Sequence, residues 1–242
     1  FTKAKTLGSR TEVPAEDAET QAELLDQLRQ LAREGDVMQK PAAEQLVSFV
    51  QQAWVLAQRY DAVVANPPYM GSKGMNAALK SFAKDSFADS KSDLFAMFIE
   101  RGFGWCKATG FNSMVTMQSW MFLPSYEVMR KALLTRNTLS TMVHMGSGVM
   151  GIAFGTAATV LCNKRIDGYA AIFSSCESGD INENGMPICF PIQNKRLKIT
   201  APDDFKKIPG SPIAYWVSNK ILSSFSELRN VGDYCDCKNG IT

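Results

Sequence analysis

The sequence predicts an α/β fold in which a doubly wound sheet, with an antiparallel hairpin at its edge, follows a pair of helices. Between residues 59 and 165, short apolar segments alternate with stretches of helical periodicity, which is typical of strands joined by crossover helices. Two apolar segments at the end of this region follow each other with a short connection, which favours an antiparallel pair. Ahead of this region, leucines recur at helical spacing.

The lead-in segment 1–58 is expected to form two helices. The apolar positions of the first are Leu24, Leu25, Leu28 and Leu31. Gly35 follows this run and is expected to end it. Pro41 stands where a second helix can begin, because the first turn does not use the missing N–H. The apolar stripe of this second helix consists of Leu46, Phe49, Val50, Ala53, Trp54 and Ala57.

The region 59–165 is expected to hold the strands and helices of the sheet. The β-branched segment 61–65 is predicted to be a buried parallel strand, and the polar stretch 71–92 a loop. The remaining expected elements are a helix at 92–106, a strand centred on 114–117, a helix at 124–136, and paired strands at 139–148 and 155–164. The segment 166–242 is expected to be a linker with one helix over 211–228.

Composition limits the classes of function. The 242 residues are 45% hydrophobic and 21% charged, which is ordinary for a globular protein, and the net charge of +2 gives no overall electrostatic case for nucleic-acid binding. No run is long enough to cross a bilayer, so no membrane partner is expected. The scattered cysteines contain no C-x-x-C pair, which predicts no metal site and thiols in a reducing cytoplasm. These cysteines are Cys106, Cys162, Cys176, Cys189, Cys235 and Cys237.

The stretch "DAVVANPPY" is the clearest candidate site. Ligands of α/β sheets bind at the carboxyl ends of strands, which is where Asn66, Pro67, Pro68 and Tyr69 fall. Prolines offer no N–H, so this stretch displays acceptors: the Asn66 side-chain oxygen and the Pro67 carbonyl. Two such acceptors can hold a planar amine and draw its nitrogen toward sp³ geometry, while Tyr69 stacks on the ring. The alternative is an ordinary turn that ends a strand.

The tetrapeptide resembles the catalytic motif of S-adenosylmethionine-dependent amino-methyltransferases. The segments that follow it resemble N6-adenine-specific DNA methyltransferases, most closely the phage-defence enzymes of BREX systems (PglX type), with type IIG restriction–modification enzymes close behind. The opening "FTKAKTLGS" and the link around "PIAYWVS" carry the likeness to the BREX enzymes. The resemblance implies a Rossmann-like methyltransferase sheet, S-adenosylmethionine as cofactor, and a flipped adenine in double-stranded DNA as substrate.

The resemblance assigns further residues. Asn66 and Pro68 would contact the cofactor together with Phe98, whose alternative role is core packing. Phe154 would meet the flipped base, although it could instead be a buried loop residue. Lys73 would face DNA. The other basic residues, Lys195, Arg196, Lys198, Lys206 and Lys207, are expected to form a solvated face more readily than a phosphate contact. The lone His144 is expected to be structural.

The resemblance also implies that part of the site is missing. The family's glycine-rich cofactor loop and the acidic residue for the ribose are not found in these residues. The chain begins with Phe1, and we expect it to be a fragment: a helical lead-in at 1–58, the C-terminal half of a catalytic domain at 59–165, and at 166–242 a link toward a DNA-recognition domain. Such a fragment should be inactive alone and bind cofactor weakly.

Two alternatives remain at this point. The same motif could act on another amine, a protein glutamine or an RNA guanine. The chain could also be a non-catalytic, methyltransferase-like module that binds DNA or other phage-defence proteins. Because loss of catalysis would place no demand on Asn66 and Tyr69, their presence favours the enzyme.

Overall fold

The computed structural model describes residue 8 and residues 11–189 and 194–228. The opening segment that carried part of the resemblance therefore lies almost wholly outside the described residues, as do Cys235, Cys237 and the end of the expected linker. None of the four described cysteines is in a disulfide. Within the described ranges, no helix is both long and apolar enough to span a bilayer, and no cluster of three side chains could hold a metal ion.

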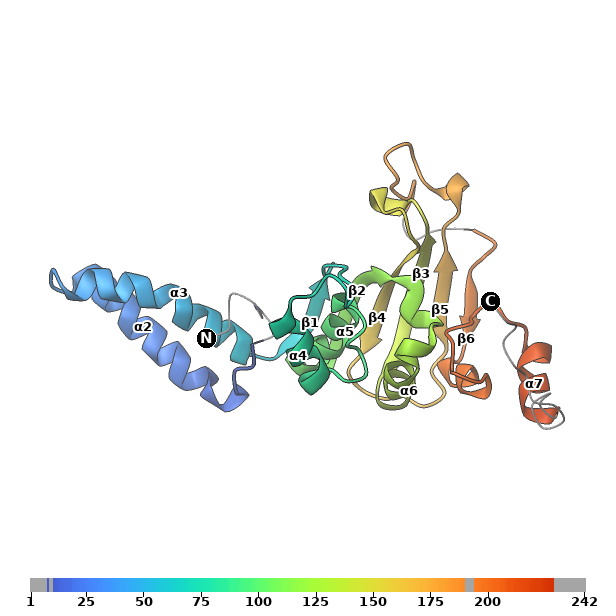
Figure 1. The fold of residues 1–242 in the computed structure, drawn as a ribbon, viewed down its shortest axis with the longest axis horizontal. Helices are drawn as coiled ribbons and strands as arrows, with labels where there is room; N and C mark the ends of the chain where they lie inside the picture. Colours follow the sequence, from blue (N-terminus) through green and yellow to red (C-terminus); the bar gives the residue numbers. More distant parts are fainter. Residues whose placement is uncertain (1–7, 9–10, 190–193, 229–242) are drawn as a thin grey trace.

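The expected pair of lead-in helices is present as an antiparallel hairpin. Helix α2 spans Ala18–Glu34 and α3 spans Gln39–Ala57, so Pro41 lies in the first turn of α3. The N–H of Gly35 closes α2 on the carbonyl of Leu31. The two helices pack mainly on each other and project from one end of the sheet (Figure 1).

A six-stranded mixed sheet forms the body of the molecule and confirms the α/β class. Its strands are β1 (Tyr60–Ala65), β2 (Cys106–Met117), β3 (Thr138–Gly146), β4 (Thr156–Cys162), β5 (Ala171–Ser175) and β6 (Lys198–Thr200). Their order is β1-β2-β4-β3-β5-β6. β1 pairs with β2, and β3 with β5, in parallel; the other pairs are antiparallel.

The hairpin of β3 and β4 is confirmed, but it is not at the sheet edge. β4 inserts between β2 and β3, so the hairpin lies inside the sheet, and β5 and β6 extend the sheet beyond it. β1 is the strand at the opposite edge. It is parallel as predicted but not buried, since Val64 is 78% exposed. The prediction of burial was wrong because Val64 lies in a hollow lined only by strand residues, on the face of the sheet opposite the core.

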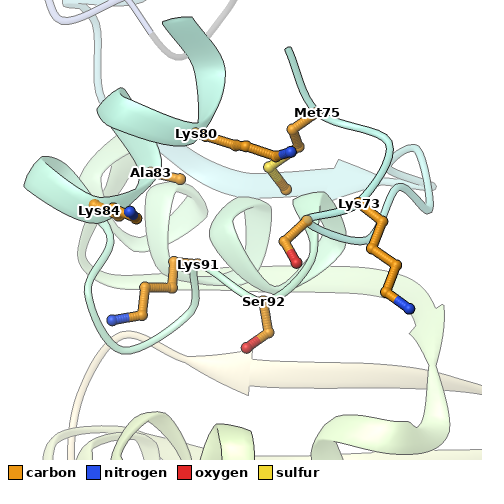
Figure 2. Close-up of a pocket in the computed structure, with 8 residues that line it drawn as sticks. Lys73, Met75, Lys80, Ala83, Lys84, Lys91 and Ser92 are labelled. Atoms are coloured by element: carbon orange, nitrogen blue, oxygen red, sulfur yellow. The ribbon is translucent and has the colours of Figure 1, made fainter. Parts of the chain in front are cut away.

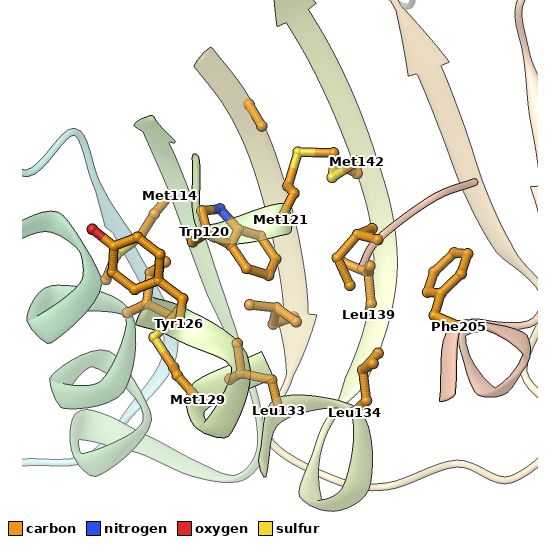
Figure 3. Packing of buried hydrophobic residues seen from close by; sticks show 14 of the residues in the cluster. Met114, Trp120, Met121, Tyr126, Met129, Leu133, Leu134, Leu139, Met142 and Phe205 are labelled. Carbon is orange, nitrogen blue, oxygen red and sulfur yellow. The ribbon is translucent and has the colours of Figure 1, made fainter. Parts of the chain in front are cut away.

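Helices α5 (Leu94–Trp105) and α6 (Glu127–Arg136) lie where helices were predicted, and they cover one face of the sheet. Figure 3 shows the resulting core, in which Trp120, Met121 and Met142 pack above Leu133 and Leu139. The sheet contributes side chains from one face to this core, because successive strand side chains point to opposite faces, and the helices supply the rest.

Two predictions about helices were incomplete. The stretch 71–92 is not all loop, because it contains α4 (Ala77–Ser86), whose first turn is capped by the Asn76 side chain accepting from the Leu79 N–H. The last helix, α7 (Asn219–Glu227), is shorter than the predicted 211–228. Ser211 has a positive φ, and residues 212–217 are not helical.

Candidate active site

The motif residues follow directly on β1 at the carboxyl edge of the parallel pair β1 and β2. The segment 66–70 is irregular, as expected for a chain in which two prolines remove backbone donors. Pro67 is buried, whereas Asn66 and Pro68 are exposed. The motif thus exposes its asparagine and its second proline, while the first proline is packed inside.

The Tyr69 hydroxyl links the motif to its own asparagine and to the neighbouring strand. Its hydroxyl lies 3.2 Å from the side-chain oxygen of Asn66 and 3.2 Å from the carbonyl oxygen of Val115 in β2. Burial raises the pKa of Tyr69, so the phenol keeps its proton and donates to these acceptors. A carbonyl oxygen has two lone pairs. The Asn66 oxygen can therefore be held by Tyr69 and still accept a hydrogen from a substrate amine.

Two phenylalanines meet the ring of Tyr69. The Phe95 ring from α5 lies edge-on to it, with centroids 6.0 Å apart, and is fully buried. The Phe154 ring is 5.9 Å away, tilted by 57°, and 44% exposed. Tyr69 thus contacts one buried aromatic ring, Phe95, and one accessible aromatic ring, Phe154. The structure brings together three of the predicted site residues, Asn66, Tyr69 and Phe154.

Asp93 holds the motif loop against the start of α5. Its carboxylate accepts the Met70 N–H at 2.9 Å and the Phe95 N–H at 3.3 Å, so it both caps the helix and fixes the residue after Tyr69. The Leu94 N–H donates to the Met70 carbonyl at 3.1 Å. Burial raises the pKa of Asp93, and the backbone donors oppose that rise. Neither Asp93 nor Phe95 was predicted as a site residue from the sequence.

Gln118 holds the loop that carries Phe154 in place. The Gln118 N–H donates to the Gly155 carbonyl at 2.9 Å. A Cβ at Gly155 would lie 2.1 Å from the Gln118 side chain, so any larger residue would displace that side chain. The Gln118 side chain also contacts Nε2 of His144, whose Nδ1 lies 3.1 Å from the Tyr215 hydroxyl. His144 is half-buried, and this partial burial lowers its pKa, which supports the structural role expected for it.

The other candidate residues lie apart from this cluster. Phe98 lies one turn beyond Phe95 on α5, is half-buried and packs against the core, so its cofactor role stays a prediction. Lys73 is exposed and lines a hollow beside the motif. Three of the other basic residues form ion pairs: Arg196 with Glu177 and Asp180, Lys206 with Asp203, and Lys207 with Asp204.

The arrangement sets an exposed amide oxygen beside aromatic rings, a geometry that can hold a planar amine. A family model described as "Eco57I restriction-modification methylase" matches residues 2–150. The chain belongs to this family.

Two curated relatives have similar sequences. The "Adenine-specific methyltransferase BrxX" of Escherichia coli O9:H4 (strain HS) is 50% identical over 236 residues, which cover 96% of this chain and 19% of that protein. The "Adenine-specific methyltransferase PglX" of Lacticaseibacillus casei (strain Zhang) is 33% identical over 186 residues, or 74% of this chain and 15% of that protein. The chain thus spans less than a fifth of either relative's length.

Among solved structures, a chain from the type I R-M system aligns with a TM-score of 0.49 at 16% identity, covering 73% of this chain and 40% of that one. The type IIG restriction endonuclease BpuSI aligns with a TM-score of 0.47 at 14% identity, covering 73% of this chain and 23% of the other.

Proposed function

We propose that this chain supplies the amine-binding part of a site-specific DNA adenine N6-methyltransferase that acts in phage defence or restriction–modification. One observation carries the proposal: the Tyr69 hydroxyl is bonded to the Asn66 side-chain oxygen while the Tyr69 ring meets exposed Phe154. Family membership and the names of the two relatives support adenine as the target.

In the proposed reaction, Asn66 Oδ1 and the Pro67 carbonyl each accept one hydrogen of the adenine N6 amine. The lone pair of the N6 nitrogen is otherwise delocalised into the ring. When Asn66 and Pro67 accept both hydrogens, this lone pair becomes available for attack. S-adenosylmethionine, when bound, supplies an electrophilic methyl group. Because the amine loses its proton only after attack, the site needs no general base, and alignment and electrostatics provide the catalysis.

Adenine must leave the DNA stack to reach this site, at a cost of a few kcal/mol. Stacking of a base on an aromatic side chain contributes roughly 1–3 kcal/mol. Tyr69 would provide that stacking surface. Phe154 would hold the base from another side, and its 44% exposure leaves a face free for that contact. Lys73, in the loop after the motif, would face the DNA backbone.

For the cofactor, we propose Asn66, Pro68 and Phe98 as the residues that this chain contributes. Asn66 and Pro68 are exposed at the end of β1, and the outer side of β1 is not paired by any described strand, so both are accessible from that side. The rest of the pocket would come from elsewhere in a longer protein. We therefore expect the 242-residue chain to show no micromolar S-adenosylmethionine binding in titration calorimetry and no methylation activity of its own.

The proposed domain organisation follows from this. The helices of 1–58 lead in, 59–165 is the C-terminal half of the catalytic domain, and 166–242 leads toward a DNA-recognition domain. An apolar hollow lies on the face of the sheet opposite the core, and its lining includes Val64, Val115 and Val143. It supports the proposal that the other half of the catalytic domain covers this face. We propose double-stranded DNA and other phage-defence proteins as partners, and the cytoplasm as the location.

The test is to map modified bases by single-molecule sequencing in cells that express the full-length protein or its Asn66→Ala variant. We expect N6-methyladenine at a defined sequence in the first and none in the second. Equal maps would overturn the proposal. Methylation of glutamine or RNA guanine instead would favour the other amino-methyltransferases. A DNA-binding protein that transfers no methyl group would be a non-catalytic module.

A further inference from the structure

A hollow beside the motif is lined by lysines from three segments. Its volume is about 360 Å³, and its lining consists of Ser72, Lys73, Met75, Lys80, Ala83, Lys84, Lys91 and Ser92. Lys80 and Lys84 project from α4, Lys73 from the loop after the motif, and Lys91 from the loop before α5 (Figure 2). We call this the four-lysine groove.

The four ammonium groups are available to bind an anion. All four lysines are exposed, none forms an ion pair within the described residues, and the groove lining contains no carboxylate. Lys80 and Lys84 stand at i and i+4 on one helix, a spacing at which like charges destabilise a helix. An anion bound between them would relieve that repulsion.

The groove has a rigid base. Met75 and Ala83 are buried in a separate apolar cluster with Leu79, Phe87 and Met97. This cluster fixes α4 on α5, so the lysine stems project from a firm surface. Figure 2 shows the amino groups of Lys73 and Lys91 on opposite sides of the hollow. Such spreading fits a polyanion with repeated charges better than a single small anion.

The groove is joined to the proposed catalytic motif by backbone hydrogen bonds. Ser72 follows Tyr69 by three residues, and its N–H donates to the Ser92 carbonyl at 3.0 Å. An extended chain of three residues spans at most about 11 Å, so the backbone of the groove begins within that distance of the Tyr69 Cα. The Asp93 carboxylate fixes Met70 in between. Groove and motif are thus connected through the segment 69–72 and the start of α5.

We infer that the four-lysine groove binds the phosphodiester backbone next to the flipped nucleotide and so holds the target strand while its base enters the site. This inference rests on the proposed function. Phosphate contacts of this kind fix register and orientation without reading sequence. Each neutralised phosphate releases counterions, so the groove should account for a measurable share of the salt dependence of binding.

The test compares binding of a target duplex by the full-length protein and by a Lys73→Gln, Lys80→Gln, Lys84→Gln, Lys91→Gln variant across salt concentrations. Each lost contact should reduce the slope of log K against log salt by about 0.9, or about 3 to 4 in total. The matched control carries Lys107→Gln, Lys131→Gln, Lys206→Gln and Lys207→Gln, which remove the same charge from lysines held in ion pairs. Its slope should stay near that of the wild type.

Three outcomes would overturn the inference: an unchanged slope in the groove variant, an equal drop in the control, or competition by inorganic phosphate beyond that of chloride at equal ionic strength. The last result would identify a small-anion site. If the quadruple variant does not fold, Lys80→Gln and Lys91→Gln alone should each lower the slope by about 0.9. Asn66→Ala should keep the slope and lose methylation. If it still methylates, the proposed function fails while the groove result stands.

Discussion

The Tyr69 hydroxyl lies 3.2 Å from the side-chain oxygen of Asn66, and the same hydroxyl lies 3.2 Å from the Val115 carbonyl oxygen of the neighbouring strand. One proton is therefore shared between the motif and the sheet. The consequence is that the amide of Asn66 does not rotate freely, although it is exposed. The proposed acceptor is therefore positioned before substrate arrives, which lowers the entropy cost of holding an amine.

Tyr69→Phe keeps the ring but loses these hydrogen bonds. A hydrogen bond is worth about 0.5–1.5 kcal/mol, so we expect methylation to fall by roughly 2- to 10-fold. Tyr69→Ala also loses the stacking surface and should fall by a further 10-fold or more. Single-turnover methylation of a duplex by the full-length protein measures both effects. Equal rates for Tyr69→Phe and Tyr69→Ala would contradict a stacking role for the ring.

Phe154→Ala should reduce methylation on the order of 10-fold while leaving the protein folded. The ring is 44% exposed, so its removal costs stability little, about 1 kcal/mol or less. Phe111→Ala is the matched control, because Phe111 is 43% exposed and pairs with Ala62, near the start of β1 and away from the motif. Rates and melting temperatures of both variants are to be compared. Similar losses of rate in the two would argue against contact between Phe154 and the base.

Asp93→Ala should destabilise the protein and disorder the motif loop. The change removes both the cap of α5 and the acceptor of Met70, and loss of a cap alone costs about 0.5–2 kcal/mol. Asp93→Asn keeps an acceptor oxygen and removes a charge that burial makes costly, so it should retain most stability and activity. Urea unfolding and methylation rates separate the two. Equal damage from both substitutions would mean that the charge itself is needed.

The sequence predicted the alternation of strands and helices, because the strongly apolar segments have clear periodicity. It missed β5 and β6, which are short and depend on pairing with a strand already in the sheet. It missed α4, although Asn76 is a recognisable cap. The place of β4 between β2 and β3 is a long-range pairing that local periodicity does not encode.

The candidate site, like the fold, was predicted only in part. Asn66 and Tyr69 were found because the motif is contiguous, and Phe154 because its loop resembles that of the family. Phe95 and Asp93 act through contacts across 23 or more positions of sequence, or through burial, and neither leaves a local signal. The contact between Tyr69 and Phe95 was therefore not predicted, and the cofactor role of Phe98 stays a separate prediction.

The lowered pKa of His144 predicts that part of the folding stability of the protein is lost in acid. Burial lowers its pKa below the usual value, so between the folded and unfolded pKa values the unfolded chain binds more protons. Its contribution is fully present above about pH 6.5 and is lost as the pH falls through that window. We expect the melting temperature to drop more for wild type than for His144→Gln between about pH 7.5 and pH 5.5. An equal drop would show that His144 does not titrate there.

Removal of the Asn66 amide tests the central claim most directly. Purified full-length protein is incubated with duplex DNA and labelled S-adenosylmethionine, and N6-methyladenine is measured by mass spectrometry. Asn184→Ala, an exposed asparagine in a turn away from the motif, is the matched control. The account predicts wild-type methylation for Asn184→Ala and a loss of about 10²-fold or more for Asn66→Ala with DNA binding retained. Undiminished N6-methyladenine from Asn66→Ala would contradict it.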